Sequence, residues 1–137
     1  MSQSVSVGDA PAYVLDTSAL LAQLHKEPGA NEVEAVGSRS VISSVNWAEV
    51  LQKVIAQGST EIEDVRRDLE SGGLRIFPFT ADDAELAAQL WSTTRRVGLS
   101  LGERACLSLA HRLGLPALTA DRAWQALNLD VEVRLIR

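Results

Sequence analysis

Short apolar runs alternate with segments of helical periodicity along almost the whole chain. Short runs at 12–15, 40–43 and 116–119 suit buried strands, and further strands are expected at 74–79, where apolar residues alternate with others, and at 131–136. Between them, apolar residues recur at helical spacing, as they do at Val45, Ala48, Leu51 and Ile55. This order predicts an α/β fold, with a mostly parallel sheet of about five strands and helices on both faces.

The length of the chain indicates a single hydrophobic core. We expect a loose N-terminal tail over residues 1–10 and one domain over residues 11–137, because no linker or internal repeat divides the sequence. No stretch approaches the roughly 20 apolar residues of a membrane span. The segment from Met1 to Pro11 lacks the basic and apolar regions of a secretory signal. We therefore expect a cytoplasmic protein without a membrane partner, and the single cysteine, Cys106, fits a reducing compartment.

Several helix starts carry the pattern of a capping box, in which a Ser or Thr is followed three residues later by an acid. The pattern occurs at Thr60 with Glu63, Thr80 with Asp83, and Ser100 with Glu103. A helix is expected to begin at each of these places. The segment 121–127 is also expected to be helical, with Asp121 as its N-cap.

Four carboxylates stand where an apolar element meets a loop or a helix start: Asp16, Glu49, Glu103 and Asp121. Asp16 directly follows one predicted strand and Asp121 lies just past another, and ligands of parallel sheets bind beyond the carboxyl ends of the strands. Carboxylate oxygens are hard ligands that suit Mg²⁺ or Mn²⁺. The net charge of −5 argues against a polyanionic partner unless such cations neutralise these acids.

Each acid also has a purely structural interpretation. Asp16 and Asp121 are good helix N-caps, and Glu103 completes the capping box of Ser100. Glu49 borders an apolar helix face and has Lys53 four residues on as an ion-pair partner. These alternatives stay open at the level of the sequence.

Other chemistries find little support in the sequence. His25 and His111 lack partners at zinc spacing, and no nucleotide-binding glycine loop or serine-hydrolase motif occurs. Cys106 lies on an apolar helix face, which favours packing. The tryptophans are scattered and are interpreted as core or interface residues: Trp47, Trp91 and Trp124.

Four segments occur in a characteristic order: Tyr13 to Leu20, Asn46 to Val50, Leu99 to Leu107 and Leu118 to Trp124. In this order and spacing they resemble the PIN domain family, and most of all the VapC-type toxins of toxin–antitoxin pairs. The resemblance extends over residues 12–136. It implies a three-layer α/β/α sandwich with a central, mostly parallel sheet.

The resemblance also implies roles for individual residues. The four acids would hold Mg²⁺ or Mn²⁺ and carry the catalysis, with Thr17 and Thr119 as supporting groups. At the third acidic position the family commonly has Asp, whereas this chain has Glu103, which moves the charge by one methylene. Arg104 and Arg122 are candidate phosphate contacts, with exposed helix charges as the alternative.

The implied activity is metal-dependent endonucleolytic hydrolysis of RNA by the toxin of a type II toxin–antitoxin pair. Its partners would be the RNA substrate, a VapB-type antitoxin and a second copy of the chain in a homodimer. One alternative is a metal-dependent phosphatase with Asp16 as nucleophile, although Ser18 stands where haloacid-dehalogenase-type enzymes usually carry a second Asp. Another is a binding module without catalysis, in which Glu103 marks a degraded site.

Overall fold

A five-stranded sheet forms the centre of the computed structural model, which describes residues 10–137. All neighbouring strands are parallel, in the order β3-β2-β1-β4-β5. The strands are β1 (Tyr13–Leu15), β2 (Ser40–Ser43), β3 (Arg75–Phe77), β4 (Ala117–Thr119) and β5 (Val133–Leu135). The predicted tail over residues 1–10 lies outside the described residues except for Ala10.

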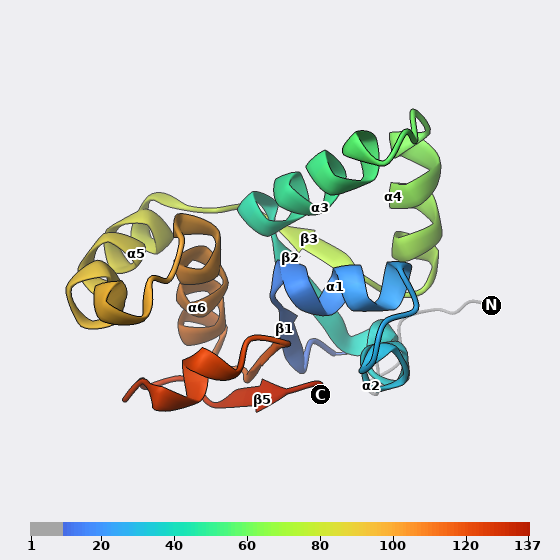
Figure 1. Ribbon diagram of the computed structural model, residues 1–137. Helices are drawn as coiled ribbons and strands as arrows, with labels where there is room; N and C mark the ends of the chain where they lie inside the picture. The colour runs from blue at the N-terminus through green and yellow to red at the C-terminus, as the bar shows by residue number, and fades with distance from the viewer. Residues whose placement is uncertain (1–9) are drawn as a thin grey trace.

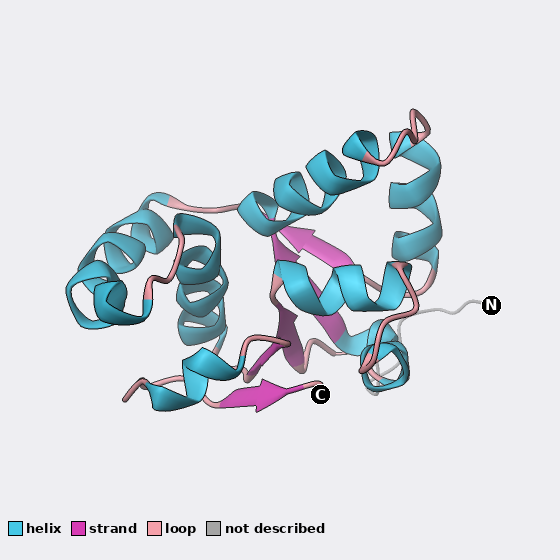
Figure 2. Ribbon diagram, viewed as in Figure 1, coloured by secondary structure: helices cyan, strands magenta, loops and turns pink. Residues whose placement is uncertain are grey.

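Helices cover both faces of this sheet (Figures 1 and 2). The α-helices are α1 (Thr17–Leu24), α2 (Ala30–Ala35), α3 (Ser44–Ala56), α4 (Ile62–Ser71), α5 (Ala81–Thr94) and α6 (Leu101–Leu113). Short 3₁₀ helices occur at η2 (Gly37–Arg39), η3 (Arg95–Val97) and η4 (Arg122–Ala126). The predicted α/β/α sandwich with a parallel sheet is therefore confirmed.

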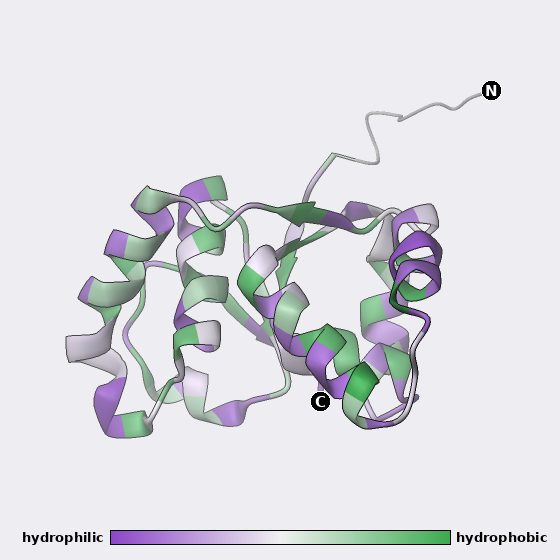
Figure 3. Cartoon of the chain, turned by 90° about the horizontal axis from the view of Figure 1, so that it is seen from above, coloured by the Kyte–Doolittle hydropathy of each residue, from purple (hydrophilic) through white to green (hydrophobic). Residues whose placement is uncertain are grey.

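Alternation along the strands creates one core on each face of the sheet. Val14 and Val41 point to the side covered by α5 and α6, whereas Leu15 and Ile42 point to the side covered by α1 and α3. All four side chains are buried, so the strands read as continuous apolar runs. Figure 3 shows the same pattern, with apolar residues on the strands and alternating polar and apolar stretches along the helices.

The strand order reverses at β1, which has β2 on one side and β4 on the other. Ligands bind at such a switch point, beyond the carboxyl ends of the strands. Asp16 directly follows β1 and Thr119 ends β4, and the Asp16 backbone N–H donates to the Leu118 carbonyl at 2.9 Å. The topology therefore places the first predicted acid at the expected ligand position.

Two of the three predicted capping boxes are formed, at the starts of α5 and α6. The prediction for Thr60 and Glu63 was wrong, because α4 begins at Ile62 with Glu61 at the N-cap position and no side-chain capping bond. The Ser59 hydroxyl accepts the Glu61 N–H at 3.4 Å instead, so the preceding turn extends further than the pattern indicated. The segment 121–127 is the 3₁₀ helix η4 rather than an α-helix.

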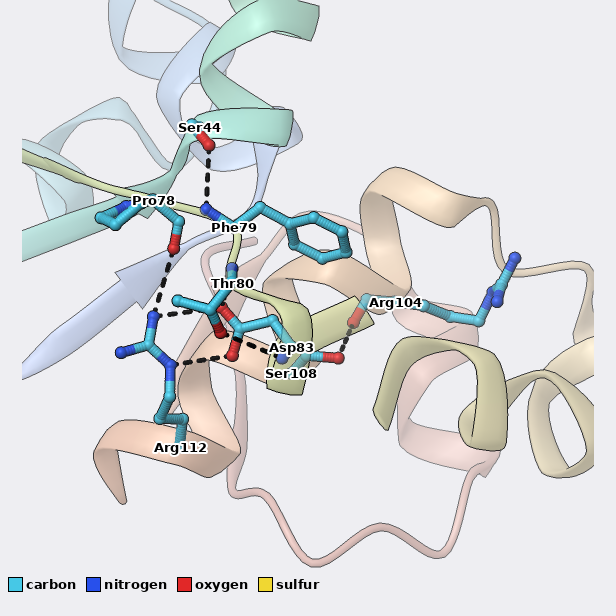
Figure 4. Close-up of polar contacts among 8 residues, drawn as sticks. All are labelled: Ser44, Pro78, Phe79, Thr80, Asp83, Arg104, Ser108 and Arg112. Carbon is cyan, nitrogen blue, oxygen red and sulfur yellow. Dashed lines mark hydrogen bonds and ion pairs between the residues drawn. The ribbon is translucent and has the colours of Figure 1, made fainter. Parts of the chain in front are cut away.

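An ion pair joins the two helices on the α5–α6 side (Figure 4). Nε of Arg112 lies 2.8 Å from Oδ1 of Asp83, and its Nη2 donates to Oδ2 at 3.0 Å and to the Pro78 carbonyl at 3.2 Å. Burial by itself would raise the pKa of Asp83, but hydrogen bonds from Arg112 and from the Thr80 backbone outweigh it and lower the pKa. The pair ties the start of α5 to the end of α6 and so fixes the helix that carries Glu103.

The segment that connects β3 to α5 is also hydrogen-bonded to α3. The Phe79 backbone N–H donates to the Ser44 hydroxyl at 3.0 Å (Figure 4). Because Ser44 begins α3 directly after β2, the two helical layers share an anchor at the carboxyl edge of the sheet.

Candidate active site

Asp16 is a buried carboxylate with one satisfied oxygen. Its side chain is 3% exposed, and Oδ2 accepts the hydroxyls of Ser18 at 2.7 Å and Thr119 at 2.9 Å. Oδ1 has no hydrogen-bond partner within residues 10–137. Asp16 occupies the N-cap position of α1, but its side chain makes no capping bond. The capping interpretation of Asp16 is therefore wrong.

The surroundings of Asp16 disfavour its charged form. Burial raises its pKa from 3.8 to about 6, and the negative charge of Glu103 adds to the rise, although the hydroxyls of Ser18 and Thr119 oppose it. A buried carboxylate with an unpaired oxygen and a raised pKa lies where a cation would be strongly stabilised.

Glu49 projects from α3 toward the starts of α1 and α6. The Thr17 hydroxyl donates to its Oε1 at 2.7 Å, and Nδ2 of Asn46 lies 3.4 Å from the same oxygen. The carboxylate rests on Gly102, where a Cβ atom would come within 2.3 Å of Oε1. Across the described part of the chain, Glu49 forms no ion pair with Lys53, so the structural alternative for this acid was wrong.

Glu103 serves the start of α6 and contacts a buried indole as well. Its Oε1 accepts the Ser100 backbone N–H at 2.9 Å, which completes the predicted capping box. Its Oε2 accepts Nε1 of Trp124 at 3.0 Å, and Trp124 is only 1% exposed. The capping bond and a role in the site are therefore compatible, because the two bonds hold the carboxylate in one orientation.

Asp121 caps η4 and is connected to Asp16 through one hydroxyl. Its Oδ1 accepts the Ala123 backbone N–H at 3.0 Å, as the capping interpretation predicted. Its own backbone N–H donates to Oγ1 of Thr119 at 3.0 Å, and that hydroxyl donates to Asp16. Asp121 thus belongs to the same end of the sheet through its backbone.

Three of the acids surround the N-terminal half of α6. Burial raises the pKa of the Cys106 thiol well above its ordinary value, and the charges of Asp16, Glu103 and Glu49 raise it further. Cys106 is fully buried, as the packing interpretation predicted. Within the described residues, no group of three or more His, Cys, Asp or Glu side chains is already assembled around a metal-sized position. The acids line one end of the sheet without meeting at a point.

The four carboxylates nevertheless offer the type of oxygen ligand that a divalent cation prefers. Mg²⁺ and Mn²⁺ prefer carboxylate oxygens and keep several waters, so they need an open site rather than a closed cage. Oδ1 of Asp16 is an unpaired buried oxygen, and the charges of Glu103 and Asp16 repel each other. A cation would pair with the free oxygen of Asp16 and would offset the repulsion between the two carboxylates.

The two arginines proposed as phosphate contacts lie in different settings. Nη1 of Arg104 donates to the Ala87 carbonyl at 2.7 Å, which directs the side chain toward α5. Arg122 is exposed on η4, directly after Asp121. Contact with phosphate stays a prediction for both.

The tryptophans divide between core and surface. Trp47 and Trp124 are buried, as the core interpretation predicted. Trp91 is 50% exposed, with the Arg95 guanidinium 5.0 Å from its ring centroid. The interface interpretation of Trp91 therefore stays a prediction, whereas a core position is excluded.

Sequence comparison identifies the family. The sequence model of the PIN domain matches residues 13–128. The chain belongs to the PIN domain family. PIN domains are generally nucleases that use divalent metal ions, so this one is assigned to the hydrolases that act on nucleic acids. None of the curated proteins shows significant sequence similarity to it.

Solved structures show the same fold as this PIN domain. A toxin–antitoxin complex from Klebsiella pneumoniae matches with a TM-score of 0.72 and 18% identity, over 92% of this chain and 98% of that chain. The DNA-bound VapBC of Salmonella typhimurium matches with a TM-score of 0.68 and 19% identity, over 93% and 99%. VapBC-5 from Mycobacterium tuberculosis matches with a TM-score of 0.59 and 28% identity, over 93% and 99%.

In the part of this PIN domain that the structure describes, no helix has the length and apolar character needed to cross a bilayer.

Proposed function

We propose that this PIN domain is a metal-dependent endoribonuclease and the toxin of a type II toxin–antitoxin pair. The observation that carries the proposal is Oδ1 of Asp16, a buried carboxylate oxygen with no protein partner beside the charge of Glu103. Such an oxygen is stabilised when it ligates a cation. Its position at the switch point of a parallel sheet is where substrates of this architecture bind.

The chain's own residues hold and orient the acids. Asp16 and Asp121 are the proposed direct ligands, and Glu49 and Glu103 ligate or orient water. The hydroxyls of Ser18 and Thr119 fix Oδ2 of Asp16, and Oδ1 has no hydrogen-bond partner among the described residues. When bound, Mg²⁺ or Mn²⁺ would supply an activated water and stabilise charge on the leaving oxygen of the phosphodiester.

Glu103 takes part through lone pairs that its protein donors leave open. Each of its oxygens accepts one N–H, from Ser100 and from Trp124. A carboxylate oxygen has a further lone pair for a metal or a water. The longer side chain of Glu, compared with the Asp common in the family, is therefore consistent with a working site rather than a degraded one.

The proposed partners follow from the relatives of the same fold. Two of those structures are named VapBC, and one is named a toxin–antitoxin complex. By this likeness we assign to the chain a VapB-type antitoxin, and the resemblance to VapC-type toxins adds an RNA substrate, a homodimeric state and a cytoplasmic location to the proposal. The half-exposed Trp91 on α5 supports an interface on that helix.

Sequencing of RNA 5′ ends in cells tests the proposal. Induction of the wild-type chain is expected to create new 5′-phosphate ends at defined sites, and induction of Asp16→Asn is expected to create none. Identical end patterns from both would contradict it. Hydrolysis of a chromogenic phosphate monoester without any new RNA ends would favour the phosphatase alternative instead.

A further inference from the structure

Asn46 is a fully buried polar residue in the segment that carries Glu49, and its side chain joins three helices. Its Nδ2 lies 2.8 Å from the Gly102 carbonyl of α6, 3.1 Å from Oγ1 of Thr17 of α1 and 3.4 Å from Oε1 of Glu49 on its own helix. Its Oδ1 has no hydrogen-bond partner among residues 10–137.

The unpaired oxygen is a cost of placing an amide at this position. A buried carbonyl oxygen without a donor destabilises the folded state, and the bonds from Nδ2 to Gly102, Thr17 and Glu49 offset this effect. Rotating the amide by 180° does not help, because it would place Oδ1 of Asn46 against two acceptors, the Gly102 carbonyl and the Glu49 carboxylate. The benefit of the amide must therefore lie in where its N–H groups point.

The N–H groups organise the surroundings of Glu49. Because Nδ2 of Asn46 donates to the Thr17 oxygen, the Thr17 hydroxyl proton is left to point at Glu49, where it forms a bond of 2.7 Å. The bond from Nδ2 to the Gly102 carbonyl fixes the first turn of α6 against α3.

Gly102 forms the remaining side of the space that the Glu49 carboxylate occupies. A Cβ atom at this position would lie 2.3 to 2.6 Å from the Glu49 carboxylate atoms, so the bare backbone lets the group approach the start of α6. A negative charge beside the first turn of a helix is stabilised by the helix dipole. Asn46 and Gly102 thus act on the same carboxylate from two helices.

We propose that Asn46 is a positioning residue, which holds the Glu49 carboxylate between Thr17 and the first turn of α6 in the orientation that metal binding requires. The inference rests on the proposed function for its consequence, since Glu49 is a proposed ligand or water-orienting group. The contact itself concerns only the chain's own residues. The contact can therefore be tested both in the presence and in the absence of metal.

A double-mutant cycle separates positioning from a merely structural role. Asn46→Leu keeps the side-chain shape and removes the donors, and Glu49→Gln removes the charge on which Asn46 would act. We expect Asn46→Leu to weaken Mn²⁺ binding, measured by calorimetry, by about ten-fold in the wild-type background. In the Glu49→Gln background it is expected to have almost no effect.

Equal losses of Mn²⁺ affinity in the two backgrounds would overturn the inference. Asn46→Asp, which has the same shape but replaces the amide donor with an acceptor, enters the same cycle if Asn46→Leu fails to fold. Thr94→Val is the matched control, because Thr94 is also a fully buried polar residue and bonds the Leu90 carbonyl away from the acids. The control is expected to leave Mn²⁺ affinity unchanged.

NMR of the metal-free protein tests the contact even if the proposed function fails. The Nδ2 protons of Asn46 should exchange slowly with solvent, and their shifts should move in Glu49→Gln. Absence of Mn²⁺ binding and RNA cleavage by the wild type would overturn the proposed function. Unmoved Asn46 resonances in Glu49→Gln would overturn the inference about Asn46, whatever the wild type binds.

Discussion

Thr119 donates its hydroxyl to Oδ2 of Asp16 at 2.9 Å, across the carboxyl ends of β4 and β1. The same hydroxyl accepts the Asp121 backbone N–H, so one side chain connects the first and the last of the four acids. Together with the Ser18 hydroxyl, Thr119 holds Oδ2 of Asp16, whereas Oδ1 has no hydrogen-bond partner among the described residues.

Asp16→Asn is expected to stabilise the metal-free protein at neutral pH. A carboxyl whose folded-state pKa is raised from 3.8 to about 6 contributes stability that is present below pH 3.8 and lost as the pH rises through 6. The shift corresponds to about 3 kcal/mol. Chemical denaturation from pH 4 to 7.5, in chelator, should show the advantage of the variant over wild type growing across this window.

Asp130→Asn provides the control for that series, because Asp130 is exposed. Its difference from wild type is expected to stay nearly constant with pH. A pH-independent difference for Asp16→Asn as well would contradict the burial of an unpaired charge at this position.

Trp124→Phe is expected to impair the site more than the fold. The change removes the indole N–H that donates to Oε2 of Glu103 and keeps an aromatic ring in the core. Loss of this bond should cost about 1 kcal/mol in the free energy of unfolding. Metal-dependent RNA cleavage should fall about ten-fold, because the orientation of a proposed site residue is lost.

Trp47→Phe is the matched substitution, since Trp47 is buried in the core on the opposite face of the sheet. Its cleavage rate should stay near that of wild type. If the two variants lose the same amount of activity, Trp124 has no specific role in holding Glu103.

The fold was predictable because its signals are local. The central strands are short apolar runs bounded by polar or turn residues, β3 and β5 mix apolar residues with arginine, and the position of Asp16 follows from the end of β1 alone. Local rules also misled where tertiary contacts compete with them. The capping box predicted at Thr60 does not form, because the Ser59 hydroxyl bonds the Glu61 N–H instead. Glu49 bonds Thr17 of another helix and not Lys53 of its own.

The parts of the site that escaped prediction are contacts between distant segments. Trp124 and Glu103 are 21 residues apart, and Asn46 and Gly102 are 56 apart. No periodicity or capping pattern relates such pairs, because packing of the helices onto the sheet brings them together. Asn46 stands three residues before Glu49 and begins one of the four segments that carry the family resemblance, and both signals in the sequence pointed to its neighbourhood.

Gly102→Ala is expected to lower activity without lowering stability. The new Cβ would lie 2.3 Å from Oε1 of Glu49 and would displace this carboxylate from its place beside Thr17. Ala is a better helix former than Gly by up to about 1 kcal/mol, so the free energy of unfolding should hold or rise. Gly37→Ala, where a Cβ would meet only the Gly72 carbonyl at 3.7 Å, is the control for cleavage assays. Unchanged cleavage by Gly102→Ala would contradict the importance of the Glu49 position.

Arg112→Met is expected to destabilise the fold by about 1–3 kcal/mol at neutral pH, because it leaves the buried Asp83 without a cation whose own side chain is partly exposed to water. The lowered pKa of Asp83 means that its contribution is present above its ordinary pKa of 3.8 and is lost as the pH falls through the folded value. The difference from wild type should therefore shrink in acid. Arg66→Met, which breaks an exposed pair with Glu70, should cost less than about 1 kcal/mol at any pH.

Cleavage of a labelled single-stranded RNA by the purified protein tests whether Asp16 anchors a metal-dependent ribonuclease site. Wild type is expected to produce fragments with 5′-phosphate ends in Mg²⁺ or Mn²⁺ and none in chelator, and folded Asp16→Asn is expected to produce none under either condition. Full cleavage by wild type and Asp16→Asn alike in chelator would contradict this role of Asp16.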